Sequence, residues 1–195
     1  MSEEHVIYMN KENEPTLMRS LGINESDIDN YSVIRAMINL MIDYNTFVNY
    51  KNRIPNLSFG IKEKLANTYH DYHIEKWLAS LCNLILVIKD THFPVNIEHI
   101  LSEDGHAFYE EKGVIPKQSY YDNIKIIRNK VQHTYNNFLD IAKTQIILKK
   151  FKEKITHKSQ AYQVYLVENA IAILKERYGD KLFLPADMLT ILKKS

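Results

Sequence analysis

Apolar residues recur at intervals of three and four positions through most of this chain. That spacing places them on one face of an α-helix. Four long helices are expected, at about 26–50, 60–89, 119–152 and 160–178. Short helices are expected at 14–20, 97–101 and 186–193. The pattern therefore predicts an all-α fold, a helical bundle of about four long helices with short additional helices.

Each long helix has an apolar stripe that is expected to enter a shared core. The widest belongs to the helix over 60–89, which is expected to be central: Leu65, Ile74, Trp77, Leu78, Leu81, Leu84, Ile85 and Ile88. The stripe of the first helix is Val33, Ile34, Met37, Met41, Tyr44 and Val48. That of the last is Val164, Val167, Ala170, Ile171 and Leu174.

Polar residues mark where these helices begin. Ser26 with Asp29, and Ser119 with Asp122, have the spacing of a capping box, in which two side chains satisfy each other's backbone amides. Asp stands there in place of the usual Glu or Gln.

The end of the helix over 119–152 is set by a change in periodicity. The pattern breaks near His157, and Ser159 is placed to cap the last long helix. Gly179 follows that helix as its terminating residue.

The amino-acid composition favours a helical domain with a hydrophobic core. In 195 residues, 45% are hydrophobic and only five are Gly and five Pro, which suits a helical domain with a real core. The acidic segment 1–24 is expected to precede a single domain over 25–195. The single cysteine, the absence of an N-terminal apolar stretch and an apolar run of only 78–88 lead us to expect a soluble cytoplasmic protein, without a membrane partner.

The net charge of +1 hides an uneven distribution. Residues 1–30 carry seven acids and two bases, whereas residues 117–158 carry ten bases and three acids. A basic segment of this kind suits a polyanion such as RNA, although a solvated lysine face without a ligand gives the same pattern.

The basic segment contains an unusual amphipathic stretch, 124–140. Its polar face carries Asn129, His133, Asn136, Asn137 and Asp140, with Arg128 at the border and no glutamate. Within it stands the string Arg128-Asn129-x3-His133-x-Tyr135.

This string resembles the R-x4-H signature of the HEPN superfamily of helical proteins, many of which are metal-independent ribonucleases. The added tyrosine resembles the R-x4-H-x-Y form of HEPN toxins encoded beside a small nucleotidyltransferase antitoxin. The resemblance implies a helical bundle that acts as a homodimer, with a composite cleft holding both copies of the motif. It also implies RNA as substrate, no metal or other cofactor, and Tyr135 as the site of antitoxin nucleotidylation.

The residue types suit that chemistry. His133 can move a proton at neutral pH, Arg128 can hold phosphate oxygens in a fork, and Asn129 can bond phosphate or orient the imidazole. Positions five apart lie about 140° apart around a regular helix, so Arg128 does not lie directly beside His133. Either the long arginine side chain curls around the helix, or the helix deforms there, or, as the resemblance implies, the site is completed across a two-fold axis by two subunits. Lys125, Lys130 and Asn136 are the expected RNA-binding residues.

Other readings of the same residues stay open. The domain can be a non-catalytic HEPN-like module for dimerisation or for RNA or protein binding. Arg128 can pair with Asp122 or with an acid on another helix, and Tyr135 can be a core or interface tyrosine. His70 and His73, one turn apart, can also hold a metal, although no third ligand stands at a familiar spacing.

Overall fold

The computed structural model describes residues 27–49, 59–102, 119–132 and 138–179. These ranges hold five helices and no strand: α2 (Ile28–Val48), α3 (Phe59–Asp90), α4 (Glu98–Leu101), α5 (Tyr120–Gln132) and α6 (Phe138–Tyr178). The prediction of an all-α protein is thus confirmed for this part of the chain. The expected acidic segment 1–24 and the short helices expected at 14–20 and 186–193 lie outside the described residues.

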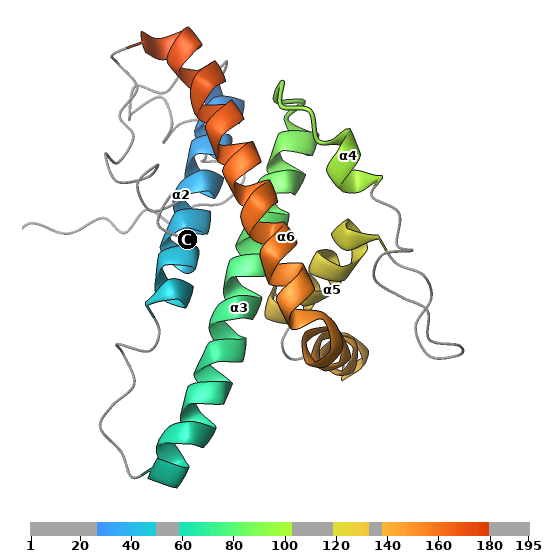
Figure 1. Ribbon diagram of the computed structural model, residues 1–195. Coiled ribbons are helices and arrows are strands. Elements are labelled where there is room, and N and C mark those ends of the chain that lie inside the picture. The colour runs from blue at the N-terminus through green and yellow to red at the C-terminus, as the bar shows by residue number, and fades with distance from the viewer. Residues whose placement is uncertain (1–26, 50–58, 103–118, 133–137, 180–195) are drawn as a thin grey trace, which may run out of the picture.

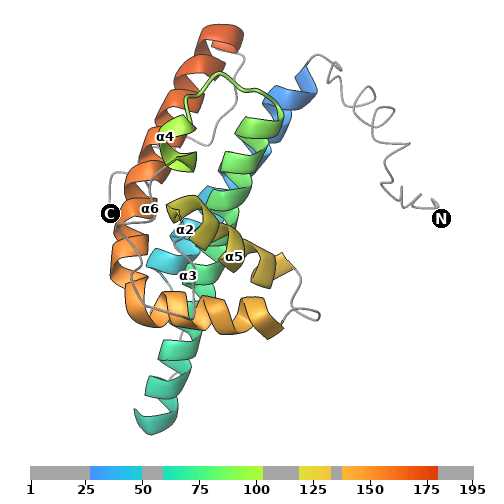
Figure 2. The same cartoon turned by 90° about the vertical axis from the view of Figure 1, so that its right-hand side faces the viewer.

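Helix α3, which has the widest predicted apolar stripe, lies at the centre of the molecule. Helix α3 packs against α2 on one side and α5 on another, and α5 in turn packs against α6 (Figure 1). Helix α6 crosses α3 with its first part and then changes direction to run along the other helices (Figure 2). No helix in the described ranges is long and apolar enough to span a membrane.

Trp77 on α3 links three helices. Its side chain is fully buried, and its ring stacks on Phe47 of α2 with centroids 5.1 Å apart. Its indole Nε1 donates to Oε1 of Gln163 on α6 at 2.6 Å. The polar edge of the largest core residue is therefore satisfied inside the core, as burial requires.

Apart from Leu65, whose side chain lies outside the described residues, the residues of the predicted stripes are buried or packed against the core, except at the end of α2. The residues predicted on α3 between 74 and 88 are all buried. On α2, Val48 was placed in the stripe but is 49% exposed, whereas Leu40 is fully buried. Phe47 rather than Val48 turns toward Trp77, because the stacked aromatic pair fills this end of the core.

The predicted capping box at Ser119 is confirmed, whereas the start of α2 is not capped as predicted. The Ser119 amide donates to the Asp122 carboxylate at 3.3 Å, and the Asp122 amide donates to the Ser119 hydroxyl at 3.1 Å. At the start of α2 the cap position is Asp27 rather than Ser26, and its side chain makes no capping bond. Its carboxylate instead accepts a hydrogen bond from the Tyr178 hydroxyl at 2.7 Å.

The predicted boundaries of the helix over 119–152 are wrong. The described part of α5 reaches Gln132, and α6 runs from Phe138 past His157 to Tyr178 without a break. The Thr156 hydroxyl donates to the carbonyl oxygens three and four positions before it. Bonds of this kind bend helices without ending them, which explains a disturbed hydrophobic pattern inside a continuous helix.

Ser159 is not a cap but a core residue of α6. Its side chain is completely buried, and its hydroxyl is 2.7 Å from the hydroxyl of Tyr120 at the start of α5. Because this tertiary bond satisfies the hydroxyl, the serine does not have to compete for a backbone group. Gly179 does follow the helix with a left-handed φ of 53°, as predicted.

Candidate functional site

Helix α5 presents Arg128 at the margin of the core. Ile124 and Ile127 are completely buried and hold α5 down on α3. Arg128 follows directly, so its side chain leaves the helix at the edge of this contact and is half-buried. The guanidinium is thus shielded on one side and open on the other, a position in which a charged group can still reach a ligand.

The Arg128 guanidinium is held by two neutral amides. Its Nε donates to Oδ1 of Asn83 on α3 at 3.1 Å, and its Nη1 donates to Oδ1 of Asn129 at 3.2 Å. Gln132 Nε2 donates to the same Asn83 oxygen at 3.3 Å. These bonds use two of the five N–H donors of arginine and leave the others for a second partner.

No carboxylate compensates the charge of Arg128 in the described part of the chain. The ion pairs recorded there join other residues, and Asp122 is engaged with Ser119. The reading of Arg128 as an ordinary salt-bridge residue therefore finds no support in these ranges. A guanidinium fixed by amides keeps its full charge for an anion.

Asn83 is a site residue that the sequence pattern did not identify. It interrupts the apolar run over 78–88, in which its neighbours Cys82 and Leu84 are completely buried. A polar residue in the apolar run of a core helix needs a partner. That signal was visible, but the partner stands 45 residues away in sequence and only the fold shows it.

The structure describes only some of the other candidate site residues. Asn129 is half-buried beside Arg128. His133, Tyr135 and Asn136 lie outside the described residues, so their roles remain predictions.

The two lysines expected to bind RNA lie in different surroundings. Lys125 is exposed. The Lys130 ammonium lies 2.5 Å from the Glu75 carboxylate of α3, and the two side chains are only 19% and 11% exposed. Lys130 is therefore neutralised by a partner, and its charge is less accessible to RNA than that of Lys125.

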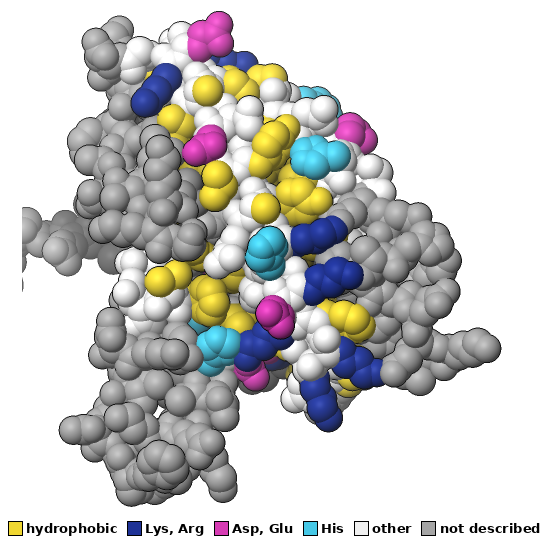
Figure 3. Space-filling view, in the orientation of Figure 1, with side chains coloured by type: hydrophobic (Ala, Val, Ile, Leu, Met, Phe, Trp, Pro, Cys, Tyr) yellow, Lys and Arg dark blue, Asp and Glu magenta, His cyan; other side chains and the backbone are white. Residues whose placement is uncertain are grey.

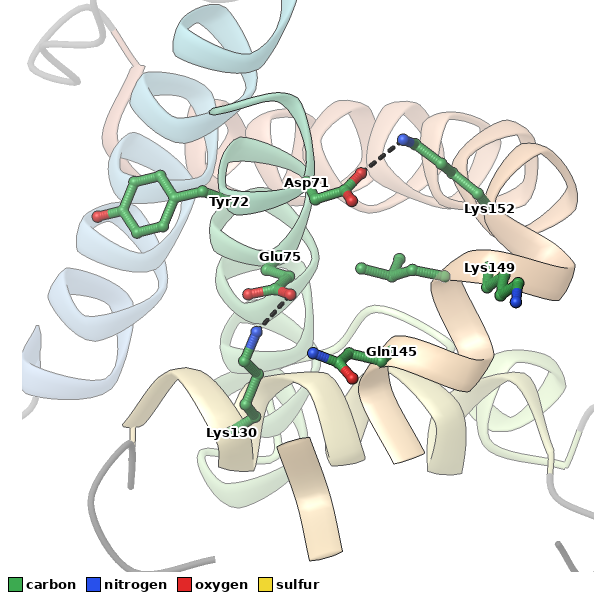
Figure 4. A pocket seen from close by; sticks show the side chains of 8 residues that line it. Asp71, Tyr72, Glu75, Lys130, Gln145, Lys149 and Lys152 are labelled. Carbon is green, nitrogen blue, oxygen red and sulfur yellow. Dashed lines mark hydrogen bonds and ion pairs between the residues drawn. The ribbon is translucent and has the colours of Figure 1, made fainter. Parts of the chain in front are cut away.

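An open cleft of about 740 Å³ lies beside this ion pair, between α3, α5 and α6. Its lining combines two acids, three lysines and a few other side chains: Asp71, Tyr72, Glu75, Lys130, Gln145, Leu148, Lys149 and Lys152. Figure 4 shows the two ion pairs of this cleft, Glu75 with Lys130 and Asp71 with Lys152.

Lysines are concentrated on the first half of α6. Between 143 and 158 the helix carries six lysines and one glutamate. In the space-filling view the Lys and Arg side chains gather over one part of the face, while hydrophobic side chains occupy another (Figure 3). Of these six lysines, Lys149 and Lys152 line the cleft, whereas Lys150, Lys154 and Lys158 line a second hollow on the same helix.

The two histidines considered as metal ligands contact other groups. His70 Nδ1 lies 3.5 Å from Oδ1 of Asp71, and its ring packs edge-on against Phe47. The His73 ring contacts Tyr72. Within the described ranges, no group of three His, Cys, Asp or Glu side chains has the arrangement of a metal site.

Cys82 lies in the core next to the site. Burial raises the pKa of its thiol from 9.0 to about 12, against a smaller opposing effect of the positive charges of Arg128 and Lys125. At neutral pH the group is thus a protonated thiol, which is a poor nucleophile, and Cys82 is not a candidate for catalysis.

This burial predicts a loss of stability at alkaline pH. In the unfolded chain the thiol loses its proton above pH 9, whereas in the folded chain it keeps it up to about pH 12. The stabilisation is therefore complete below pH 9 and falls as the pH rises, by about 1 kcal/mol at pH 10.

Urea denaturation of the wild type at pH 8 and pH 10 measures this effect. The Cys82→Ala variant is the control, since its free energy of unfolding should change by about 1 kcal/mol less between the two pH values. Equal changes in the two proteins would contradict the assignment.

Comparison of the chain with protein-family models, with curated proteins and with solved structures gave no match.

Proposed function

We propose that this protein is a metal-independent endoribonuclease of toxin or phage-defence type, a HEPN-like helical bundle that acts as a homodimer. One observation carries the proposal most directly. The Arg128 guanidinium is fixed by the amides of Asn83 and Asn129 and has no carboxylate beside it among the described residues. Such a group is prepared for an anion, and it stands within the string that resembles the HEPN signature.

The chemistry follows from the residue types. His133 removes the proton of the ribose 2′-hydroxyl, and the 2′-oxygen attacks the adjacent phosphorus. The bond from phosphorus to the 5′-oxygen breaks, a protonated imidazole returns a proton to that leaving oxygen, and a 2′,3′-cyclic phosphate remains. Arg128 stabilises the charge on the phosphate oxygens throughout, so the reaction proceeds without a metal ion.

The helical geometry favours a site shared by two copies. Arg128 and His133 are separated by five positions, which on a regular helix span about 140°. His133 lies outside the described residues, so the shared site rests on this expectation and on the resemblance. A two-fold axis beside α5 brings two arginines and two histidines into one groove. The antitoxin of the subgroup that the string resembles would then act on Tyr135.

A second candidate is a HEPN-like module that binds RNA or protein without cutting. The observation that favours it is the same hydrogen-bond network. The bonds of Arg128 and Gln132 to Asn83 tie α5 to α3, and this structural role explains the arginine without any substrate. The two candidates differ in turnover, which is directly measurable.

The test is RNA cleavage by the purified full chain in the presence of EDTA. Wild type should cleave, and Arg128→Gln should cleave about 10- to 100-fold more slowly, because one charge-assisted contact to the phosphate is lost. Arg35→Gln, which changes an exposed arginine of α2, is the matched control and should cleave like wild type. Unimpaired cleavage by Arg128→Gln, or no cleavage by wild type, would reject the nuclease and leave the binding module.

A further inference from the structure

Arg128 is not among the residues that line the cleft between α3, α5 and α6. Lys130 lines it from α5 and directly follows Asn129, which bonds Arg128. Its volume of about 740 Å³ is within the range of ligand-binding clefts.

One face of α6 forms the opposite wall. Gln145, Leu148, Lys149 and Lys152 stand at intervals of three and four residues, so they share this face. In Figure 4, Gln145 reaches from α6 toward the side of the cleft where Lys130 lies, and Lys152 points at Asp71. Tyr72 points away from the two ion pairs in the same view, so it is not the feature that selects a ligand.

The two ion pairs of the cleft differ in how easily a ligand can replace them. Glu75 and Lys130 are 11% and 19% exposed, so separating them would leave a poorly solvated charge. Asp71 and Lys152 are 50% and 35% exposed, and their bond of 2.6 Å is open to water. Exposed pairs are weak, so an anion can displace Asp71 from Lys152.

Lys149 adds a second available charge. It is exposed and has no carboxylate within 4 Å among the described residues. Lys149 and Lys152 lie within one turn of α6, inside the segment 143–158 with its six lysines and one glutamate. A charged surface that extends beyond the cleft suits a polymer with repeated phosphates better than a single small anion.

We propose that the cleft between α3, α5 and α6 binds single-stranded RNA, with Lys149 and Lys152 contacting backbone phosphates and Asp71 giving up Lys152 when the strand enters. The choice of RNA rests on the proposed function, whereas the binding of a phosphodiester strand rests on the cleft. Lys130 remains paired with Glu75 and supports the wall.

The experiment measures binding of a fluorescent single-stranded RNA of about 12 nucleotides to the full chain by anisotropy. All proteins carry His133→Ala so that the proposed cleavage does not consume the RNA. Salt is varied from about 50 to about 200 mM, because the slope of affinity against salt counts phosphate contacts. The variants are Lys149→Gln with Lys152→Gln, and Asp71→Asn. Lys175→Gln is the matched control, an exposed lysine near the other end of α6.

The double lysine variant should bind more weakly and lower the salt slope by about 1.4, the value for two phosphate contacts on a single strand. Asp71→Asn should bind about two- to fivefold more tightly, because a competing carboxylate is removed. Lys175→Gln should behave like its parent. Circular dichroism of each variant establishes that its fold is unchanged.

The outcomes separate this inference from the nuclease proposal. An unchanged slope in the double variant, an equal loss in Lys175→Gln, or no RNA binding by the parent overturns the cleft assignment, whether or not wild type cleaves RNA. If wild type does not cleave but the cleft variants change binding as stated, the nuclease proposal fails and the binding cleft stands.

Discussion

His133→Ala is expected to lower the rate of RNA cleavage by about 10²- to 10⁴-fold, the contribution of a positioned general acid or base. The imidazole is the one group of the proposed site that can both accept and return a proton near neutral pH. Arg128 and Asn129 bind and orient, and neither replaces it. The loss should therefore be larger than that of Arg128→Gln.

Single-turnover cleavage of a defined RNA by the purified full chain measures this loss. His157→Ala is the matched control, because it removes an exposed imidazole from α6. Thermal unfolding of both variants shows whether the fold is preserved. Cleavage that survives His133→Ala in a folded protein would remove the proposed mechanism.

Mixing two impaired variants tests whether the site is shared. In an equal mixture of Arg128→Gln and His133→Ala, half of the dimers contain one copy of each. If the arginine of one copy serves the histidine of the other, one of the two Arg128–His133 pairs in the groove of each mixed dimer is intact. Activity then returns to about a quarter of the wild-type value, whereas a site built within one copy gives no recovery.

The helices could be predicted from the sequence because their evidence is local. The spacing of Ile74, Trp77 and Leu81 specifies a buried face, and Ser119 with Asp122 specifies a helix start, without knowledge of any other part of the chain. The predicted break near His157 was wrong for the opposite reason. Ser159 stays within α6 because its hydroxyl meets that of Tyr120, a contact between residues 39 positions apart.

For the candidate site, too, the sequence reveals the local features but not the distant contacts. The string from Arg128 to Tyr135 is local and could be noticed in the sequence. The groups that decide how its residues behave are distant, since Asn83 stands 45 positions before Arg128 and Glu75 stands 55 positions before Lys130. An amide partner leaves the charge of Arg128 available, and a carboxylate partner neutralises that of Lys130. Residue type alone predicts the same role for both.

Because its partner is a carboxylate, Lys130 is expected to contribute strongly to the stability of the fold. Lys130→Met should lower the free energy of unfolding by about 3 kcal/mol, because the Glu75 carboxylate would remain nearly buried without its partner. The value is at the low end for buried pairs, since both side chains keep some contact with water. Lys152→Met, which breaks the exposed pair with Asp71, is the matched control and should cost no more than about 1 kcal/mol.

Urea denaturation of the single variants and of the double variant Glu75→Leu with Lys130→Met measures the pair. The double variant should recover most of the loss, because a buried ion pair and an apolar pair of similar size contribute about equally to stability.

RNA binding by folded Lys130→Met then separates the two roles of this lysine. A salt slope equal to that of the parent is expected, because Glu75 rather than RNA holds the ammonium group. A slope lower by about 0.7 would instead assign Lys130 a phosphate contact of its own.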